Sequence, residues 1–205
     1  MIDTTLRAVL SLFKNFDNQS LSPFTTYCNL YMDYNTTCPT IKSASDTPHN
    51  YGGSCTPGTF SSYGMSGYVC YVGNDEGSAN VGSESAIIYS FTLPAGTYLY
   101  SLQLKYLAFG SDGYDGGDTA VAEVLLAGTT IWSQNISRCT VAYGTAKLSG
   151  SLSGGSKELR LRLRITGVNG GWLDHRNFTV DDVWFTVSKP IPVQVESPSM
   201  SLIAT

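Results

Sequence analysis

The stretch Ile87–Trp132 (IIYSFTLPAGTYLYSLQLKYLAFGSDGYDGGDTAVAEVLLAGTTIW) decides the fold class of this chain. Its middle part places apolar side chains at every second position, at Tyr98, Tyr100, Leu102, Leu104 and Tyr106. A period of two is typical of a strand with one face on a core and the other in water, and helical spacing fits none of the stretch. Turns at Pro94–Gly96 and Ala127–Gly128 divide the stretch into several strands.

The same alternation returns in the last third of the chain. In residues 158–165 the apolar side chains point one way, and the other face carries Glu158, Arg160, Arg162 and Arg164. In residues 178–187 the pattern buries Val183, Phe185 and Val187 and leaves Trp184 facing outward. Strands separated by glycine-rich turns therefore predict an all-β protein.

Four pieces of the sequence, taken in order, resemble the galactose-binding-like jelly roll, which is the fold of many carbohydrate-binding modules. They are residues 15–24 (NFDNQSLSPF), 66–73 (SGYVCYVG), 87–132 and 178–185 (FTVDDVWF). The chain departs from the family pattern at Asp17, where Glu is usual, and at Phe24, where Trp is usual. The resemblance implies a jelly-roll β-sandwich over residues 15–188, with an insertion at 25–65 that has no counterpart.

The segments on either side of the sandwich are expected to be arms. Residues 1–14 have apolar side chains at helical spacing, which predicts a short helix or arm that packs on the sandwich or on a neighbouring subunit. Residues 189–205 contain three prolines and are predicted to form an extended tail. The tail either binds another chain, giving a homo-oligomer, or folds back over a sheet edge.

Cysteines and glycosylation sequons point to the same cellular setting. No metal-site spacing relates the first four cysteines, so we predict disulfides among Cys28, Cys38, Cys55 and Cys70. Cys139 is left to be free, to pair with one of the four, or to link chains. The Asn-x-Ser/Thr sequons are at Asn18, Asn35, Asn135 and Asn177. Together these features favour an extracellular or virion-surface glycoprotein.

Composition and motifs exclude several functional classes. A net charge of -4 argues against a general nucleic-acid binder, and no apolar run is long enough to span a bilayer. The two histidines, His49 and His175, lie in separate loops, and no G-x-S-x-G motif is present. We therefore expect a binding or structural protein and not an enzyme.

Adjacent carboxylates at Asp181 and Asp182, on a strand with apolar neighbours, are the candidate metal ligands. Such a pair is costly unless it is offset, and Ca²⁺ takes several oxygen ligands, including backbone carbonyls. In the resembled family the opening acidic residue and the first Asp of the D-D-V motif share a structural calcium, which implies Asp17 and Asp181 here. The alternative is that these residues cap turns or pair with Arg.

A sugar needs an aromatic surface for the apolar side of its ring and polar groups for its hydroxyls. The aromatic side chains expected outside the core are Tyr114, Trp172 and Trp184. Arg160 and Arg162 either pair with carboxylates of a neighbouring strand or bind an acidic sugar or partner. Each exposed aromatic side chain could equally belong to a protein contact.

Two functions follow from this sequence. The first is a non-catalytic carbohydrate-binding or adhesion module on a cell or virion surface, with a carbohydrate or glycoprotein as its partner. The second is a structural subunit of a virion appendage or extracellular filament, assembled through the terminal arms. A fold does not by itself decide between them.

Overall fold

The computed structural model of the chain describes residues 4–30, 39–48, 55–74, 80–111, 118–168 and 176–192. Within these ranges the regular elements are β1 (Thr4–Lys14), β2 (Thr25–Cys28), β3 (Thr40–Ser43), the 3-10 turn η1 (Phe60–Tyr63), β4 (Tyr68–Asn74), β5 (Glu84–Gly110), β6 (Thr119–Leu126), β7 (Thr129–Ile136), β8 (Val141–Gly167) and β9 (Arg176–Pro192). None of the described segments is a helix long and apolar enough to cross a membrane.

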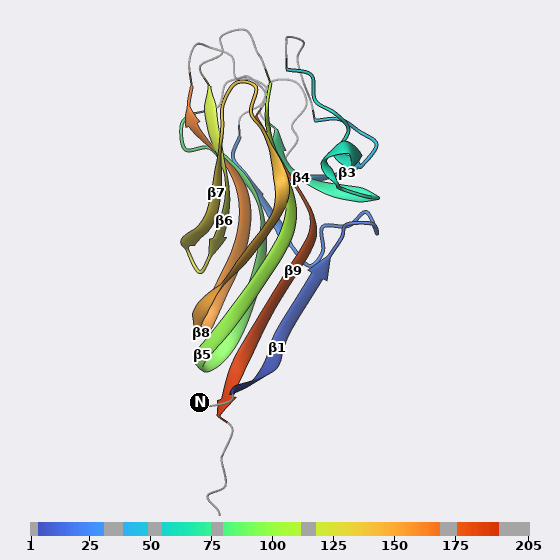
Figure 1. The fold of residues 1–205 in the computed structure, drawn as a ribbon. Helices are drawn as coiled ribbons and strands as arrows, with labels where there is room; N and C mark the ends of the chain where they lie inside the picture. Colours follow the sequence, from blue (N-terminus) through green and yellow to red (C-terminus); the bar gives the residue numbers. More distant parts are fainter. Residues whose placement is uncertain are drawn as a thin grey trace, which may run out of the picture.

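The strands form a two-layered β-sandwich, as the sequence predicts (Figure 1). The long strands β5 and β8 pair along almost their whole length, from Glu84 opposite Arg164 to Phe109 opposite Val141. The first layer is built on one end of this ribbon, residues 84–93 of β5 and 155–167 of β8. There β2 pairs with β5, β6 pairs with β8, and β7 pairs with β6. The second layer is built on the other end of the ribbon, where β5 pairs with β8 on one side and with β9 on the other. The outer edge of β9 pairs with β1 and β4, and β3 pairs with β4.

The corner between the layers lies at the predicted Pro94–Gly96 turn. The β5–β8 register shifts between Leu93 and Thr97, where the ribbon bends over (Figure 1). The Tyr98 hydroxyl donates to the carbonyl oxygen of Pro94 at 3.0 Å, which ties the two sides of the bend together. A Cβ atom at Gly154 of β8 would collide with that same Pro94 carbonyl oxygen, so the close approach of the two strands requires glycine.

The core lies between the two layers and is built by the alternating residues. Its fully buried members include Leu102, Leu104, Leu159, Leu161, Leu163, Ile165, Val183, Phe185 and Val187. Because each such side chain contributes roughly 1.5–3 kcal/mol when it is removed from water, this alternation stabilises the two layers against each other.

The N-terminal segment corrects the sequence interpretation, because residues 4–14 form a strand and not a helix. β1 pairs antiparallel with β9, from Thr4 opposite Pro192 to Lys14 opposite Val183, with an irregularity between Ala8 and Leu10. This irregularity changes which face the side chains occupy, so the apolar spacing imitates that of a helix. Pairing satisfies the backbone groups of the β9 edge, which an amphipathic helix would leave open.

Residues 39–48 and 55–65 of the predicted insertion cover the outside of the second layer. A second apolar cluster forms there, with buried members Ala44, Phe60, Met65, Val69, Tyr71, Leu107 and Phe109. Cys55, which the sequence predicts to be in a disulfide, pairs with Cys139 of the β7–β8 loop, with Cα atoms 5.3 Å apart. This bond fastens the covering segment to the sandwich.

The other cysteines have different states. Cys28 is disulfide-bonded, in agreement with prediction. Cys70 is a free, fully buried thiol, so its predicted disulfide is wrong. Its place in β4 explains this, because β4 directs Cys70 into the main core and away from the covering segment. Burial raises the pKa of this thiol well above its ordinary value. Cys38 lies outside the described residues.

The boundary of the C-terminal tail shifts. The sandwich was expected to end at residue 188, but β9 continues to Pro192 by pairing with the start of β1. The remaining residues of the predicted tail, 193–205, lie outside the described residues.

Candidate functional site

The outward face of the second layer carries a row of four side chains across four strands. Phe13 of β1 lies opposite Trp184 of β9, Trp184 lies opposite Gln103 of β5, and Gln103 lies opposite Lys147 of β8. Strand pairing therefore brings together two aromatic rings, an amide and an ammonium from distant parts of the sequence. We call these four residues the aromatic row.

The aromatic pair is exposed and stacked. The ring centroids of Phe13 and Trp184 are 3.9 Å apart, with 36° between the ring planes. The two side chains keep 46% and 50% of their surface in contact with solvent. The outward direction predicted for Trp184 is therefore confirmed. Two half-exposed rings side by side on an open sheet form an apolar surface that the described part of the chain leaves uncovered.

A second row, made of hydroxyl groups, lies beside the aromatic row. It consists of Ser11, Thr186, Ser101 and Ser149, which are paired in that order across the same four strands. All but the half-buried Thr186 are exposed. We call this set the hydroxyl row; it places neutral donors and acceptors next to the aromatic pair.

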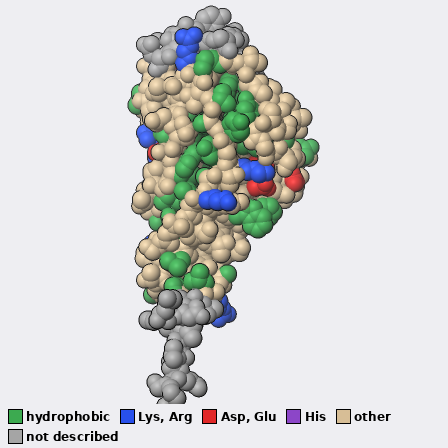
Figure 2. Space-filling model, in the orientation of Figure 1, with side chains coloured by type: hydrophobic (Ala, Val, Ile, Leu, Met, Phe, Trp, Pro, Cys, Tyr) green, Lys and Arg blue, Asp and Glu red, His purple; other side chains and the backbone are tan. Residues whose placement is uncertain are grey.

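An ion pair borders the aromatic row on its other side. The Lys105 ammonium lies 2.8 Å from an oxygen of Asp182, and this contact raises the pKa of Lys105 above its ordinary value. Figure 2 shows the same face of the molecule, with basic and acidic side chains beside a hydrophobic group near its middle. The face thus combines an apolar surface with amide, hydroxyl and charged groups.

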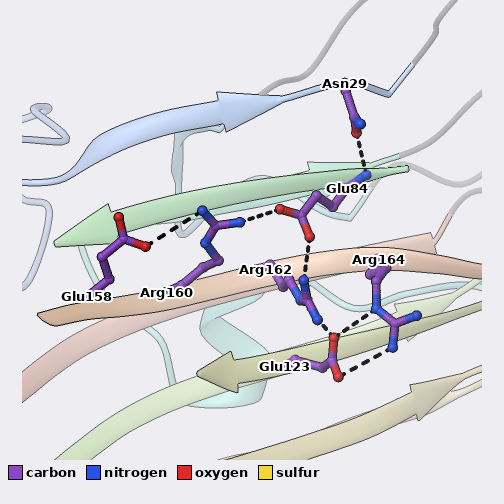
Figure 3. A network of polar contacts seen from close by, with 7 residues as sticks. All are labelled: Asn29, Glu84, Glu123, Glu158, Arg160, Arg162 and Arg164. Atoms are coloured by element: carbon purple, nitrogen blue, oxygen red, sulfur yellow. Dashed lines mark hydrogen bonds and ion pairs between the residues drawn. The ribbon is translucent and has the colours of Figure 1, made fainter. Parts of the chain in front are cut away.

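The arginines of β8 lie on the outer face of the first layer and are engaged with carboxylates (Figure 3). Arg160 and Arg162 contact Glu84 of β5 at 2.5 and 2.6 Å, and Arg162 also contacts Glu123 of β6 at 2.8 Å. Arg164 reaches Glu123 at 3.1 Å. This is the first of the two arrangements that the sequence allowed. A sugar-binding role of Arg160 and Arg162 stays a prediction, in competition with these ion pairs.

A shallow hollow of about 550 Å³ lies at the lower end of the first layer. It is lined by residues of β5 and β8 and by the β6–β7 turn at Ala127 and Gly128. The lining includes the hydroxyls of Ser90, Thr92 and Ser156 together with Lys157 and Glu158. It is a second polar surface, separate from the aromatic row.

The predicted calcium ligands Asp17 and Asp181 converge on one short segment. The backbone N–H of Ser66 donates to Asp181 at 3.2 Å, and that of Tyr68 donates to Asp17 at 3.1 Å. Asp181 is fully buried, and this burial raises its pKa to about 6. The side chain of Asp182 instead pairs with Lys105.

Two carboxylates in this position suit a cation only if backbone oxygens complete the shell. Among the described residues no group of three or more His, Cys, Asp or Glu side chains could hold a metal. Both oxygens of buried Asp181 accept hydrogen bonds from backbone N–H groups, Oδ2 from Ser66 and Oδ1 from Asp182.

The glycosylation sequons differ in accessibility. Asn18 and Asn135 are exposed. Asn177 is fully buried on β9, so the prediction of a glycan there is wrong for the folded chain. Asn35 lies outside the described residues, as do Tyr114 and Trp172 of the predicted sugar site. Phe13 was missed because its segment was interpreted as a helix.

Comparisons with known proteins concern the fold. No family model and no curated protein matches the chain. Among solved structures, the K1 cleaved adhesin domain of Lys-gingipain from Porphyromonas gingivalis W83 is 11% identical, with a TM-score of 0.46 over 86% of this chain and 97% of that chain. The CBM22-1 xylan-binding domain of Paenibacillus barcinonensis Xyn10C is 11% identical, with a TM-score of 0.44 over 90% of this chain and 97% of that chain.

A third similar structure is the enzymatically active domain of bacteriophage CBA120 tailspike protein 4. It is 12% identical, with a TM-score of 0.39 over 85% of this chain. The present chain spans only 20% of that tailspike chain. Carbohydrate-binding and adhesin domains are among the structures to which the chain is similar.

Proposed function

We propose that this protein is a non-catalytic carbohydrate-binding module that acts on a cell or virion surface, and that it binds glycans on the outward face of the second layer. The observation that carries the proposal is the half-exposed Trp184, stacked on Phe13 beside the hydroxyl row. A sugar ring places its apolar side on such an aromatic surface, while hydroxyl and amide groups bond its oxygens.

The test is a glycan array followed by calorimetry with four proteins: the wild type, Trp184→Ala, Tyr143→Ala and Ser156→Tyr. Tyr143 is the matched control, because it is an exposed aromatic residue on the same layer that contacts the tilted ring of Tyr63, with centroids 5.0 Å apart. Binding that is lost in Trp184→Ala and kept in Tyr143→Ala supports the proposal. Binding that survives Trp184→Ala, or is abolished by Ser156→Tyr in the hollow, moves the site elsewhere and contradicts it.

A structural subunit is the second candidate function, and one observation favours it. Pairing between β5 and β9 ends at Leu99 opposite Ser188, so Lys189–Pro192 pair only with β1. This two-stranded ribbon carries the exposed side chains of Leu6 and Ile191. Sedimentation of the full chain and of a chain truncated after Pro192 tests this candidate, because assembly through the tail requires a smaller particle for the truncated chain.

We further propose that Asp17 and Asp181 hold a structural Ca²⁺ together with backbone oxygens. What supports this is the attachment of both carboxylates to the segment Ser66–Tyr68 and the burial of Asp181. The ion would connect Asp17 in the loop after β1, the segment Ser66–Tyr68 at the start of β4, and Asp181 of β9.

A further inference from the structure

The aromatic row has a direction, which constrains the ligand. Its apolar end is Phe13 and Trp184, and its cationic end is Lys147, with Gln103 between them. Neighbouring strands lie about 4.8 Å apart, so the Trp184 and Lys147 backbones are separated by about 10 Å. That distance is comparable to the length of a disaccharide.

Within the described residues, no carboxylate neutralises the cationic end. Lys105, on the same face, has Asp182 as its partner at 2.8 Å. Lys147 is exposed and has no ion pair within the described part of the chain. Its outward neighbours along β8 are Thr145 and Ser149, and its outward neighbour on β5 is Gln103, none of which carries a charge. The face therefore keeps one positive charge on a chain whose net charge is -4.

We propose that the ligand is an anionic glycan that lies across the strands, with one sugar ring on Trp184 and the acidic group of the next sugar at Lys147. This inference rests on the proposed function of the same face. The hydroxyl row runs parallel to the aromatic row across the same four strands, so it lies beside the proposed path of the glycan. Lysine suits this role because its ammonium is a point charge on a flexible stem, and its three N–H groups donate hydrogen bonds to a carboxylate or a sulfate.

Calorimetry with three oligosaccharides of equal length tests the inference: a uronic-acid oligomer, its carboxyl-reduced neutral counterpart and a sulfated neutral oligomer. We expect the wild type to bind a charged oligomer more tightly than the neutral one, by about two- to fivefold, as for an exposed ion pair. The charged oligomer that binds more tightly shows whether the anionic group of the ligand is a carboxylate or a sulfate. Raising the salt concentration should remove this preference while leaving neutral binding unchanged.

Variants of Lys147 test the preference for a charged oligomer separately from glycan binding itself. Lys147→Gln should abolish the preference for the charged oligomer, and Lys147→Glu should reverse it. Lys157→Gln, on the other layer, is the matched control and should behave as the wild type does. Neutral binding that equals charged binding in the wild type, with no effect of Lys147→Gln, overturns the inference but leaves the proposed function intact. No binding of any oligomer overturns the proposed function as well.

Discussion

Phe13 and Trp184 stack across β1 and β9 with their ring centroids 3.9 Å apart, so the first strand and the closing strand share one exposed aromatic pair. Removal of Phe13 should therefore affect both stability and the environment of Trp184. We expect Phe13→Ala to lower the free energy of unfolding by about 1 kcal/mol, as for other aromatic pairs. Urea unfolding followed by tryptophan fluorescence measures this.

Val9→Ala is the control for that experiment, because Val9 is also exposed on β1. Its effect should be smaller than that of Phe13→Ala, and it should leave the fluorescence maximum in place. Equal effects of the two substitutions would show that the stacked pair contributes nothing beyond the burial of β1.

Glu123 holds Arg162 and Arg164 at 2.8 and 3.1 Å while only 7% of its side chain is exposed. Glu123→Gln should lower the free energy of unfolding by about 2 kcal/mol at neutral pH, because hydrogen bonds to charged groups are lost and two guanidiniums lose their counter-charge. The exposure of Arg164 keeps the expected loss below that of a fully buried pair. Glu158→Gln is the control, because Glu158 is 53% exposed and lies 3.8 Å from Arg160; its effect should be within about 0.5 kcal/mol.

The carboxylate of Glu123 should also make the free energy of unfolding depend on pH. Burial alone would raise the pKa of Glu123, but hydrogen bonds and charges from Arg164 and Arg162 outweigh it and hold the pKa below its ordinary value. A carboxylate with a lowered pKa contributes stability above its unfolded pKa and loses it as the pH falls through the folded value. The difference in stability between the wild type and Glu123→Gln should therefore be full at neutral pH and shrink below about pH 4. A constant difference down to pH 2 would contradict the ion-pair account.

The sequence predicts the parts of this fold in which local pattern and tertiary structure agree. The period of two in residues 98–106, the corner at Pro94–Gly96 and the outward direction of Trp184 all depend on nearest-neighbour alternation, which strand pairing preserves. The β1 strand was missed because its irregularity at Ala8 and Leu10 breaks that alternation. Its partner β9 lies at the opposite end of the chain, so no local signal predicts the pairing.

The candidate site was predictable only in part, for a related reason. Trp184 is visible from the phase of its own strand, but Phe13, Gln103 and Lys147 join it through the register of three strand pairs. Likewise, Cys55 and Cys139 are 84 residues apart in sequence, and the pairing depends on where the covering segment packs. Register and long-range packing are properties of the assembled sheet and leave no trace in composition or spacing.

The Cys55–Cys139 disulfide should stabilise the chain mainly through its long closed loop. For a separation of 84 residues, the chain-entropy relation gives an upper value of about 4.6 kcal/mol. A Cys55→Ser/Cys139→Ser double variant should therefore melt at a lower temperature and release the cover of Phe60 and Leu107. Dye binding to exposed apolar surface, together with calorimetry, checks this; an unchanged melting temperature would contradict it.

Cys70 gives a separate prediction, because it is a free thiol with no exposed surface. Burial raises its pKa, so the reactive thiolate is scarce as well as inaccessible. In the folded, non-reduced protein Cys70 should resist alkylation, and it should be labelled once the chain is unfolded. Peptide mapping after pulse labelling measures this, and rapid labelling of Cys70 in the folded protein would show that β4 opens locally.

Calcium binding between Asp17 and Asp181 predicts a rise in melting temperature with added Ca²⁺ and a fall with EDTA. At an ion concentration of about one hundred times Kd the gain is roughly 2.7 kcal/mol, which corresponds to roughly 5–10 °C for a domain of this size. Asp181→Asn should abolish the response, because the amide lacks the charge that the buried site supplies. Asp182→Asn is the matched control: it removes the ion pair with Lys105 but should keep the calcium response, since the backbone N–H of Ser66 donates to Asp181 and the Asp182 carboxylate is engaged by Lys105. Identical melting curves for the wild type in EDTA and in Ca²⁺ would refute the site, and loss of the response in Asp182→Asn alone would transfer it to the other carboxylate.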